Sequence, residues 1–323
     1  MALLKGKKGT IHHASSFNAS KDADTLRTAM KGLGTDEDAL LKLLIGRSNY
    51  QRQEIALAYK TEYGRDLVED LKSELSGKFE QLLVALMVPS SLYDAYELRN
   101  AIKGAGTSEH VLIEILASRT CSEIAGIKKE YQKEYERELE SDITGDTCGP
   151  FEKLLVVLVQ ANREPDGKVN DGEIEQDAKD LFDAGENKWG TDEEKFIRIM
   201  GSKSISHLRR VFDKYMTISG YQIEESIERE TSGNFKELML AVVKCIRSIQ
   251  CYLAEVLYNA MKGAGTDDHT LIRVMVSRSE IDLWDIRQAF RQNHGQSLHS
   301  MINNDTSGDY RLALLLLCGG EDD

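Results

Sequence analysis

The stretch Met30-Lys31-Gly32-Leu33-Gly34-Thr35 is the first of four short loops that end in Gly-Thr. Forty residues after the last glycine of each loop stands an acid, and three residues past that acid stands another glycine. The loops end at Gly34-Thr35, Gly106-Thr107, Gly190-Thr191 and Gly265-Thr266; the acids are Glu74, Asp146, Glu230 and Asp305; the glycines are Gly77, Gly149, Gly233 and Gly308. Since acids make up 54 of the 323 residues, four at one offset would arise by chance roughly once in a thousand sequences. The pattern indicates a fourfold repeat.

The pairing of a glycine-rich loop with a distant acid predicts a calcium site. Glycine adopts positive φ at no steric cost, so such a loop can turn its backbone carbonyls inward. Calcium takes about six to eight oxygen ligands, and three carbonyls with one bidentate carboxylate supply about five. The remaining positions suit an external anion such as a phosphate oxygen. One acid per site also predicts weak calcium binding in free solution.

The same loops are typical of turns between helices. Thr35, followed by Asp36, Glu37 and Asp38, has the pattern of an N-cap with acids in the first helical turn. This interpretation explains the threonines and the local acids, and we accept it for them. It does not explain an acid and a glycine at one distant offset in every repeat, so we favour calcium.

The third loop departs from the other three. It reads Gly185-Glu186-Asn187-Lys188-Trp189-Gly190-Thr191, with lysine where the others carry their first glycine. Trp189 occupies the tip of this loop, and tryptophan favours the interface between membrane and water. A tryptophan folded back into the core is the alternative. Because its neighbours are loop-forming residues, we favour a membrane contact for Trp189.

Composition limits the partners of the chain. The formal charge of −13 disfavours nucleic acid and disfavours an anionic bilayer unless calcium mediates the contact. No apolar run reaches the 18 or so residues that span a bilayer, and Met1–Lys8 lacks the pattern of a secretory signal. Five cysteines without metal-type spacing indicate reduced thiols. We therefore expect a cytoplasmic protein that becomes peripheral on membranes when calcium rises; unconventional release from cells stays open.

Apolar periodicity predicts an all-α fold with about five helices per repeat. Residues 38–45 and 77–87 have the spacing of helices with apolar faces. The Gly-Thr loop should join the first two helices of a repeat, and the acid-x-x-Gly loop the last two. The expected boundaries are a tail at 1–15, repeats at 16–88, 89–161, 174–247 and 248–323, and a linker at 162–173. This linker should divide the chain into two halves of two repeats.

The four loops with their distant acids resemble the annexin core, over about residues 16 to 320. The resemblance implies four five-helix repeats arranged as a curved disc, with the calcium loops on its convex face. The short N-terminal tail and the third loop point to one subtype within that family. The implied ligands are loop carbonyls and the distant carboxylate, with a lipid phosphoryl oxygen completing the calcium shell.

Carried onto this sequence, each site takes three carbonyls and one carboxylate. The four sets are Met30, Gly32, Gly34 with Glu74; Ile102, Gly104, Gly106 with Asp146; Gly185, Lys188, Gly190 with Glu230; and Met261, Gly263, Gly265 with Asp305. The third set rests on the loop that departs from the family pattern.

We therefore expect reversible, calcium-dependent binding to anionic phospholipid, with phosphatidylserine as the headgroup that the resemblance implies. The resemblance further implies a monomer in solution and trimers on membranes. A calcium-regulated ion channel is the first alternative, because Asp94, Glu97, Arg119 and Arg278 resemble charged residues that line a central groove in annexins; a buried ion-pair network is the interpretation we favour for them. An enzyme is the second alternative, but the sequence has no motif for a nucleophile and its base. We expect no catalysis.

Overall fold

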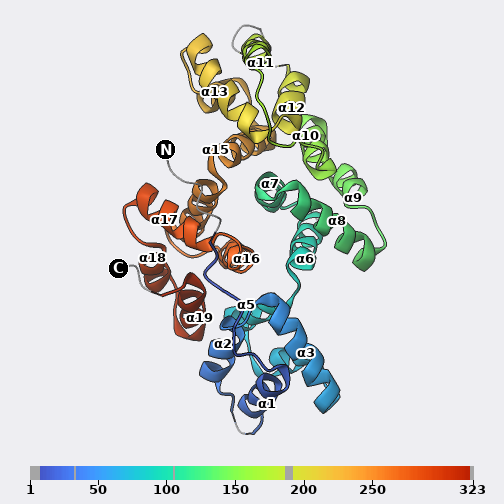
Figure 1. Ribbon diagram of the computed structural model, residues 1–323, viewed down its shortest axis with the longest axis vertical. Coiled ribbons are helices and arrows are strands. Elements are labelled where there is room, and N and C mark those ends of the chain that lie inside the picture. The colour runs from blue at the N-terminus through green and yellow to red at the C-terminus, as the bar shows by residue number, and fades with distance from the viewer. Residues whose placement is uncertain (1–7, 33, 105, 186–191, 321–323) are drawn as a thin grey trace. The chain divides into compact units, whose positions relative to one another are not determined.

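The amphipathic segments between the loops fold as helices (Figure 1). The structure is a computed structural model that describes residues 8–32, 34–104, 106–185 and 192–320. Repeat I contains α1 (Ala19–Ala29), α2 (Glu37–Ile45), α3 (Asn49–Tyr63), α4 (Leu67–Glu74) and α5 (Gly77–Met87). Repeat II contains α6 (Ser90–Ile102), α7 (Glu109–Ser118), α8 (Cys121–Tyr135), α9 (Leu139–Asp146) and α10 (Gly149–Gln160). In the described residues there is helix but no strand, which confirms the all-α prediction.

The second half of the chain repeats this order. Repeat III contains α11 (Asp171–Ala184), α12 (Glu193–Ser202), α13 (Ile205–Ser219), α14 (Ile223–Glu230) and the start of α15 (Gly233–Met261). Repeat IV contains the rest of α15, α16 (Asp268–Arg278), α17 (Leu283–His294), α18 (Leu298–Asp305) and α19 (Gly308–Cys318). Ser248 has non-helical angles inside α15, with φ −164°, and marks the passage from repeat III to repeat IV. Each repeat therefore has the five helices expected.

Short polar signals set the ends of the helices. Ser48 and Gln51 form a capping box at the start of α3, in which each side chain meets the backbone of the other. Gly64 ends the same helix in the left-handed conformation, with φ 65°, where a Cβ would be strained. Local sequence therefore determines where α3 begins and stops.

The last helix of each repeat buries an apolar face. In α5 the side chains of Phe79, Leu82, Leu83 and Leu86 are all buried, and α10, α15 and α19 bury comparable apolar sets. Burying such side chains provides most of the driving force for folding. None of the helices in the described ranges is long and apolar enough to cross a bilayer.

The repeats pack in other pairs than the expected two halves, which were repeats I and II and repeats III and IV. One compact unit joins the residues up to Tyr93 with those from Leu253 onward, and the other runs from Asp94 to Tyr252. Repeat I thus packs with repeat IV, through contacts of α5 with α16 and of α19 with α2 and α5. Repeat II packs with repeat III, through α10 and α12. In this division residues 162–173 lie inside the second unit, and the boundaries expected from the sequence stay a prediction.

A buried aspartate of α4 ties α3 and α1 to its own helix in repeat I, the latter through an ion pair of 3.7 Å with Arg27. Asp70 accepts a hydrogen bond of 2.6 Å from the Tyr59 hydroxyl and bonds of 2.6 to 3.0 Å from the Arg65 guanidinium. Repeat II has the same arrangement 72 residues later, with Asp142 as the acceptor and Tyr131, Arg137 and Arg99 as donors. Hydrogen bonds from Arg137 hold the pKa of Asp142 below its ordinary value, and those from Tyr131 and the nearby charges of Arg137 and Arg99 act the same way, whereas burial opposes them.

Asp142→Ala should lower the free energy of unfolding by about 3 kcal/mol, because it leaves buried donors without their acceptor. Urea unfolding of the variant measures this loss. Asp38→Ala is the control, since Asp38 forms an exposed 2.6 Å ion pair with Lys42, and exposed pairs contribute less than about 1 kcal/mol. Equal losses in the two variants would contradict the stabilising role of Asp142.

The lowered pKa of Asp142 also predicts a dependence of stability on pH. Its contribution is fully present above the unfolded-state pKa of about 3.9 and is lost as the pH falls through the lower folded-state pKa. The wild-type chain should therefore lose stability more steeply than Asp142→Asn on acidification from about pH 5 to about pH 3. If the free energy of unfolding fell equally with pH in the wild type and in Asp142→Asn, this assignment would be contradicted.

Candidate metal centres

The distant acid of a repeat lies against the Gly-Thr loop of the same repeat. In repeat I the Thr35 hydroxyl donates a hydrogen bond of 3.0 Å to Oε2 of Glu74. In repeats II and IV the hydroxyls of Thr107 and Thr266 donate to the Oδ2 atoms of Asp146 and Asp305. Residues 39 positions apart in the chain are thus in direct contact. The adjacency that the repeat pattern could only suggest is present in three repeats.

The sequence predicted that the threonines cap the helices that follow them. This prediction is wrong, because the next residue is the N-cap in every repeat. In repeat I the N-cap is Asp36, whose side chain accepts from the Ala39 N–H. In the other repeats the N-caps are Ser108, Asp192 and Asp267. The threonine one position earlier is therefore free of that task in repeats I, II and IV, and its hydroxyl holds the distant acid. A threonine that recurs immediately before a better N-cap residue was the signal for this role.

One backbone hydrogen bond closes the loop in all four repeats. The N–H of Asp36 donates to the carbonyl of Ala29 over 2.9 Å. The corresponding bonds are Ser108 to Ala101 at 2.8 Å, Asp192 to Ala184 at 2.8 Å and Asp267 to Ala260 at 2.7 Å. The third loop is longer by one residue than the others, yet it is closed in the same way. Loop ends are therefore equivalent in the four repeats.

Positive φ angles in the loops require glycine. Gly32 and Gly34 have φ of 122° and 94°, a region that residues with a Cβ rarely adopt. The glycines of the second and fourth loops behave in the same way; they are Gly104, Gly106, Gly263 and Gly265. In repeat III, Gly185 corresponds to Met30, and the two residues have similar φ angles of −111° and −99°. Three loops thus have the backbone form that a carbonyl-lined cation site needs.

The short acid-x-x-Gly segments connect the last two helices of each repeat. Glu74 is the final residue of α4 and Gly77 the first of α5. Gly77 has φ 64°, and Gly149, Gly233 and Gly308 have φ between 62° and 68°. The fixed spacing of three residues therefore follows from a tight turn that glycine must begin. This turn presents the acid at the end of its helix, next to the Gly-Thr loop.

Several predicted site residues fall outside the described residues. These are Lys188, Trp189 and Gly190 of the third loop. Glu230 is described and ends α14, as its counterparts end α4, α9 and α18. The assignment of the sixteen metal ligands and of Trp189 stays a prediction. Within the described ranges no three His, Cys, Asp or Glu side chains gather to hold a metal ion; the predicted sites have one carboxylate each and would not form such a group.

Three of the four charged residues expected at a central groove, Asp94, Arg119 and Arg278, form ion pairs within their own units. Nε and Nη2 of Arg119 donate to the two carboxylate oxygens of Asp94 over 2.7 and 2.9 Å, and both side chains are buried. Arg278 makes a similar pair with Asp282, at 2.7 and 2.8 Å. Buried bidentate pairs of this kind fix the position of helices. The ion path stays a hypothesis.

Gly106→Ala should destabilise the protein by about 1–3 kcal/mol, because φ of 119° strains any residue with a Cβ. Gly145→Ala in the helix α9 of the same repeat is the matched control, and it should raise stability by up to about 1 kcal/mol. Urea unfolding without calcium compares the two. A neutral Gly106→Ala would mean that the loop relaxes and does not hold its carbonyls in place.

Comparison with known proteins agrees with this architecture. The family model described as Annexin matches the chain four times, over residues 21–86, 93–158, 176–242 and 252–317. Annexin A5 of Cynops pyrrhogaster is 71% identical over 323 residues, which is 100% of both chains. Annexin A5 of Bos taurus is 67% identical over 316 residues, or 98% of each chain. The likeness to annexin V that the short tail and the third loop indicated agrees with these relatives.

Solved structures give the same result. The structure of chicken annexin V in complex with Zn2+ has a TM-score of 0.95 and 65% identity, covering 98% of this chain and 100% of that one. The structure of calcium-bound annexin (Sm)1 has a TM-score of 0.86 and 36% identity, covering 99% of this chain and 95% of that one. The fold of four repeats is therefore shared over the full length of the chain.

Proposed function

The chain belongs to the annexin family, which binds calcium and phospholipid, and from this premise we propose that it attaches reversibly to anionic phospholipid membranes by calcium bridging. The observation that carries the proposal is the contact between the Gly-Thr loop and the distant acid. It places a carboxylate beside a loop of positive-φ glycines in repeats I, II and IV. Carbonyls and a carboxylate are the oxygen ligands that calcium prefers.

The residues present fit a calcium ion. In repeat I the carbonyls of Met30, Gly32 and Gly34 would hold it together with the carboxylate of Glu74, which the Thr35 hydroxyl orients. The other repeats would use the sets predicted from the sequence. Bound calcium would supply open coordination positions that phosphate oxygens of a lipid headgroup fill. A relative, annexin (Sm)1, was solved with calcium bound.

The charge of the chain makes the dependence on calcium physically reasonable. At −13 the protein is repelled by an anionic bilayer. Few charges per site give weak calcium affinity in solution, and anionic lipid must then strengthen calcium binding by the same factor by which calcium strengthens lipid binding. Several weak sites on one protein multiply into tight attachment. Because attachment depends on several weakly bound calcium ions, it should reverse when the calcium concentration falls.

We extend the proposal to the membrane contact of Trp189, to phosphatidylserine as the headgroup, and to trimers on the membrane. A tryptophan at the tip of a loop would place its ring at the acyl boundary and its N–H among the headgroups. The proposal describes a binding protein and assigns no catalytic step to any residue.

Sedimentation with phosphatidylserine vesicles across a calcium titration tests the proposal. Glu74→Gln combined with Asp305→Asn should raise the calcium needed for half-maximal binding by about tenfold, because two of the four sites lose their carboxylate. Wild-type binding should vanish with chelator and with vesicles of neutral lipid. Failure of the wild type to bind at millimolar calcium would overturn the proposal.

A matched control removes two charges elsewhere on repeat I. Glu62 and Glu69 are exposed and lie in α3 and α4 away from the loop contacts. The pair Glu62→Gln and Glu69→Gln changes the net charge by the same amount as the test variant. It should leave the calcium requirement unchanged. A shift equal to that of the test variant would show that net charge, and not the ligand set, governs binding.

A further inference from the structure

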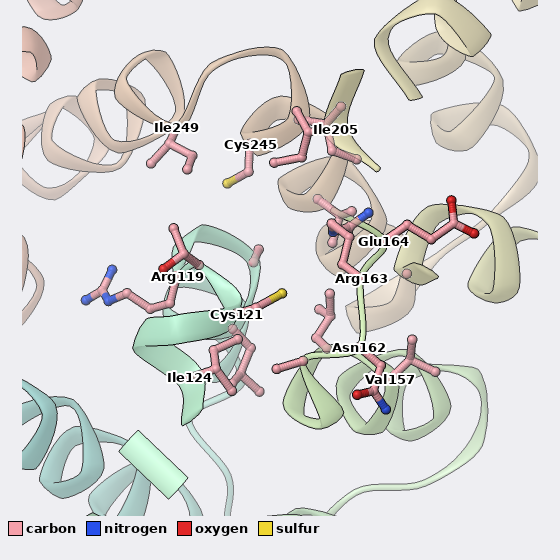
Figure 2. Close-up of a pocket in the computed structure, with 18 of the residues that line it drawn as sticks. Arg119, Cys121, Ile124, Val157, Asn162, Arg163, Glu164, Ile205, Cys245 and Ile249 are labelled. Atoms are coloured by element: carbon pink, nitrogen blue, oxygen red, sulfur yellow. The ribbon is translucent and has the colours of Figure 1, made fainter. Parts of the chain in front are cut away.

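A cavity of about 310 Å³ lies inside the compact unit formed by repeats II and III (Figure 2). Its walls come from the junction of α7 and α8, the end of α10 with the segment that follows it, and the helices α12, α13 and α15. Protein sites for small organic molecules begin at about this volume and are mostly apolar with a few polar groups. The cavity has the size of such a site.

The wall of the cavity is largely aliphatic. Its branched side chains include Leu116, Ile124, Val157, Ile205, Val242 and Ile249. Gly201 brings α12 close to α10, since a Cβ on this glycine would lie 2.4 Å from Cγ1 of Val157. The two helices therefore touch at the cavity wall, and most of the surface beside that contact is apolar. A ligand with an aliphatic body would gain by leaving water for this surface.

Two thiols face this apolar space. Figure 2 shows the side chains of Cys121 and Cys245 projecting from opposite walls. Cys245 is buried, whereas Cys121 is half-buried and can be reached from the cavity. Cys148 and Cys251 are exposed and do not line the cavity. The chain thus carries one accessible cavity thiol and two surface thiols for comparison.

Cys121 lies at the start of a helix and shares the cavity wall with Arg163. Cys121 is the first residue of α8, where the helix end favours negative charge. The Arg163 guanidinium donates to the carbonyls of Lys203 and Met200 over 2.7 and 2.8 Å and is thereby held in the wall. Burial lowers the pKa of Arg163, while its attraction to Cys121, Asp166 and Cys245 opposes the lowering. Cys121 and the fixed Arg163 guanidinium therefore line the same cavity.

We propose that this cavity binds small apolar α,β-unsaturated aldehydes and that Cys121 is modified there. The aliphatic chain of the aldehyde lies against the isoleucine and valine wall. The Cys121 sulfur, after losing its proton to water, forms a bond to the β-carbon, and the π pair of the C=C bond moves to the α-carbon. The α-carbon then takes a proton from water, which leaves a saturated aldehyde joined by a thioether. No oxidant or reductant is consumed.

The test compares two enals that share the reactive group and differ in the tail. Full-length protein without calcium is treated with trans-2-nonenal or with acrolein, and adducts are counted by mass spectrometry, since trypsin separates all five cysteines. The ratio of nonenal rate to acrolein rate should be at least about tenfold higher at Cys121 than at Cys148, because the nonenal tail gains burial only in the cavity. Equal ratios at the two thiols would overturn the proposal.

Protection and substitution locate the reaction in the cavity. The unreactive 1-nonanol should slow the nonenal reaction at Cys121 by about tenfold at saturation and leave Cys148 and Cys251 unaffected. Ile205→Trp, which fills the cavity, should lower the ratio of nonenal rate to acrolein rate at Cys121 to the value at Cys148. Cys121→Ser should abolish the fast adduct. A lack of protection by 1-nonanol in the wild-type chain, or transfer of the fast adduct to Cys245, would refute the assignment without reference to the stability of any variant.

Discussion

A hydrogen bond between a threonine hydroxyl and a distant carboxylate holds the two functional loops of a repeat together. It links Thr35 with Glu74 in repeat I and recurs in repeats II and IV. Without this contact the acid would be one of many surface carboxylates on a chain that has 54 acids. With it, the acid is held against a loop whose glycines have positive φ. This juxtaposition is the basis of the weak calcium site that we propose.

The interior of the repeats varies more than their loops. Repeats I and II both bury an aspartate, Asp70 or Asp142, that gathers tyrosine and arginine donors. Serine at 226 and methionine at 301 stand at the corresponding places in repeats III and IV. Those repeats nonetheless close their Gly-Thr loops with the same backbone bond. The loop geometry therefore depends on the backbone and on glycine, and several different interiors can support it.

The pairing of repeats is a matter of side-chain packing across long distances in the chain. Repeat I packs with repeat IV, and repeat II with repeat III. The segment at 162–173 has the composition of a linker because it is polar and contains Pro165. It nonetheless packs along the boundary between repeats II and III, where the Arg163 guanidinium donates hydrogen bonds to carbonyls at the end of α12. The cavity beside Cys121 lies at the same boundary. A segment with the composition of a linker is thus a structural part of one compact unit.

The sequence by itself determined the helices, their number per repeat and the four loops with their acids. It could do so because glycine, N-cap residues and apolar periodicity act over a few neighbouring residues. The tertiary structure alone decided that Thr35 holds Glu74 and leaves capping to Asp36, and that Cys121 and Cys245 share a cavity. These contacts join residues 39 and 124 positions apart, and each depends on how the helices pack, which preferences acting over a few neighbouring residues do not determine.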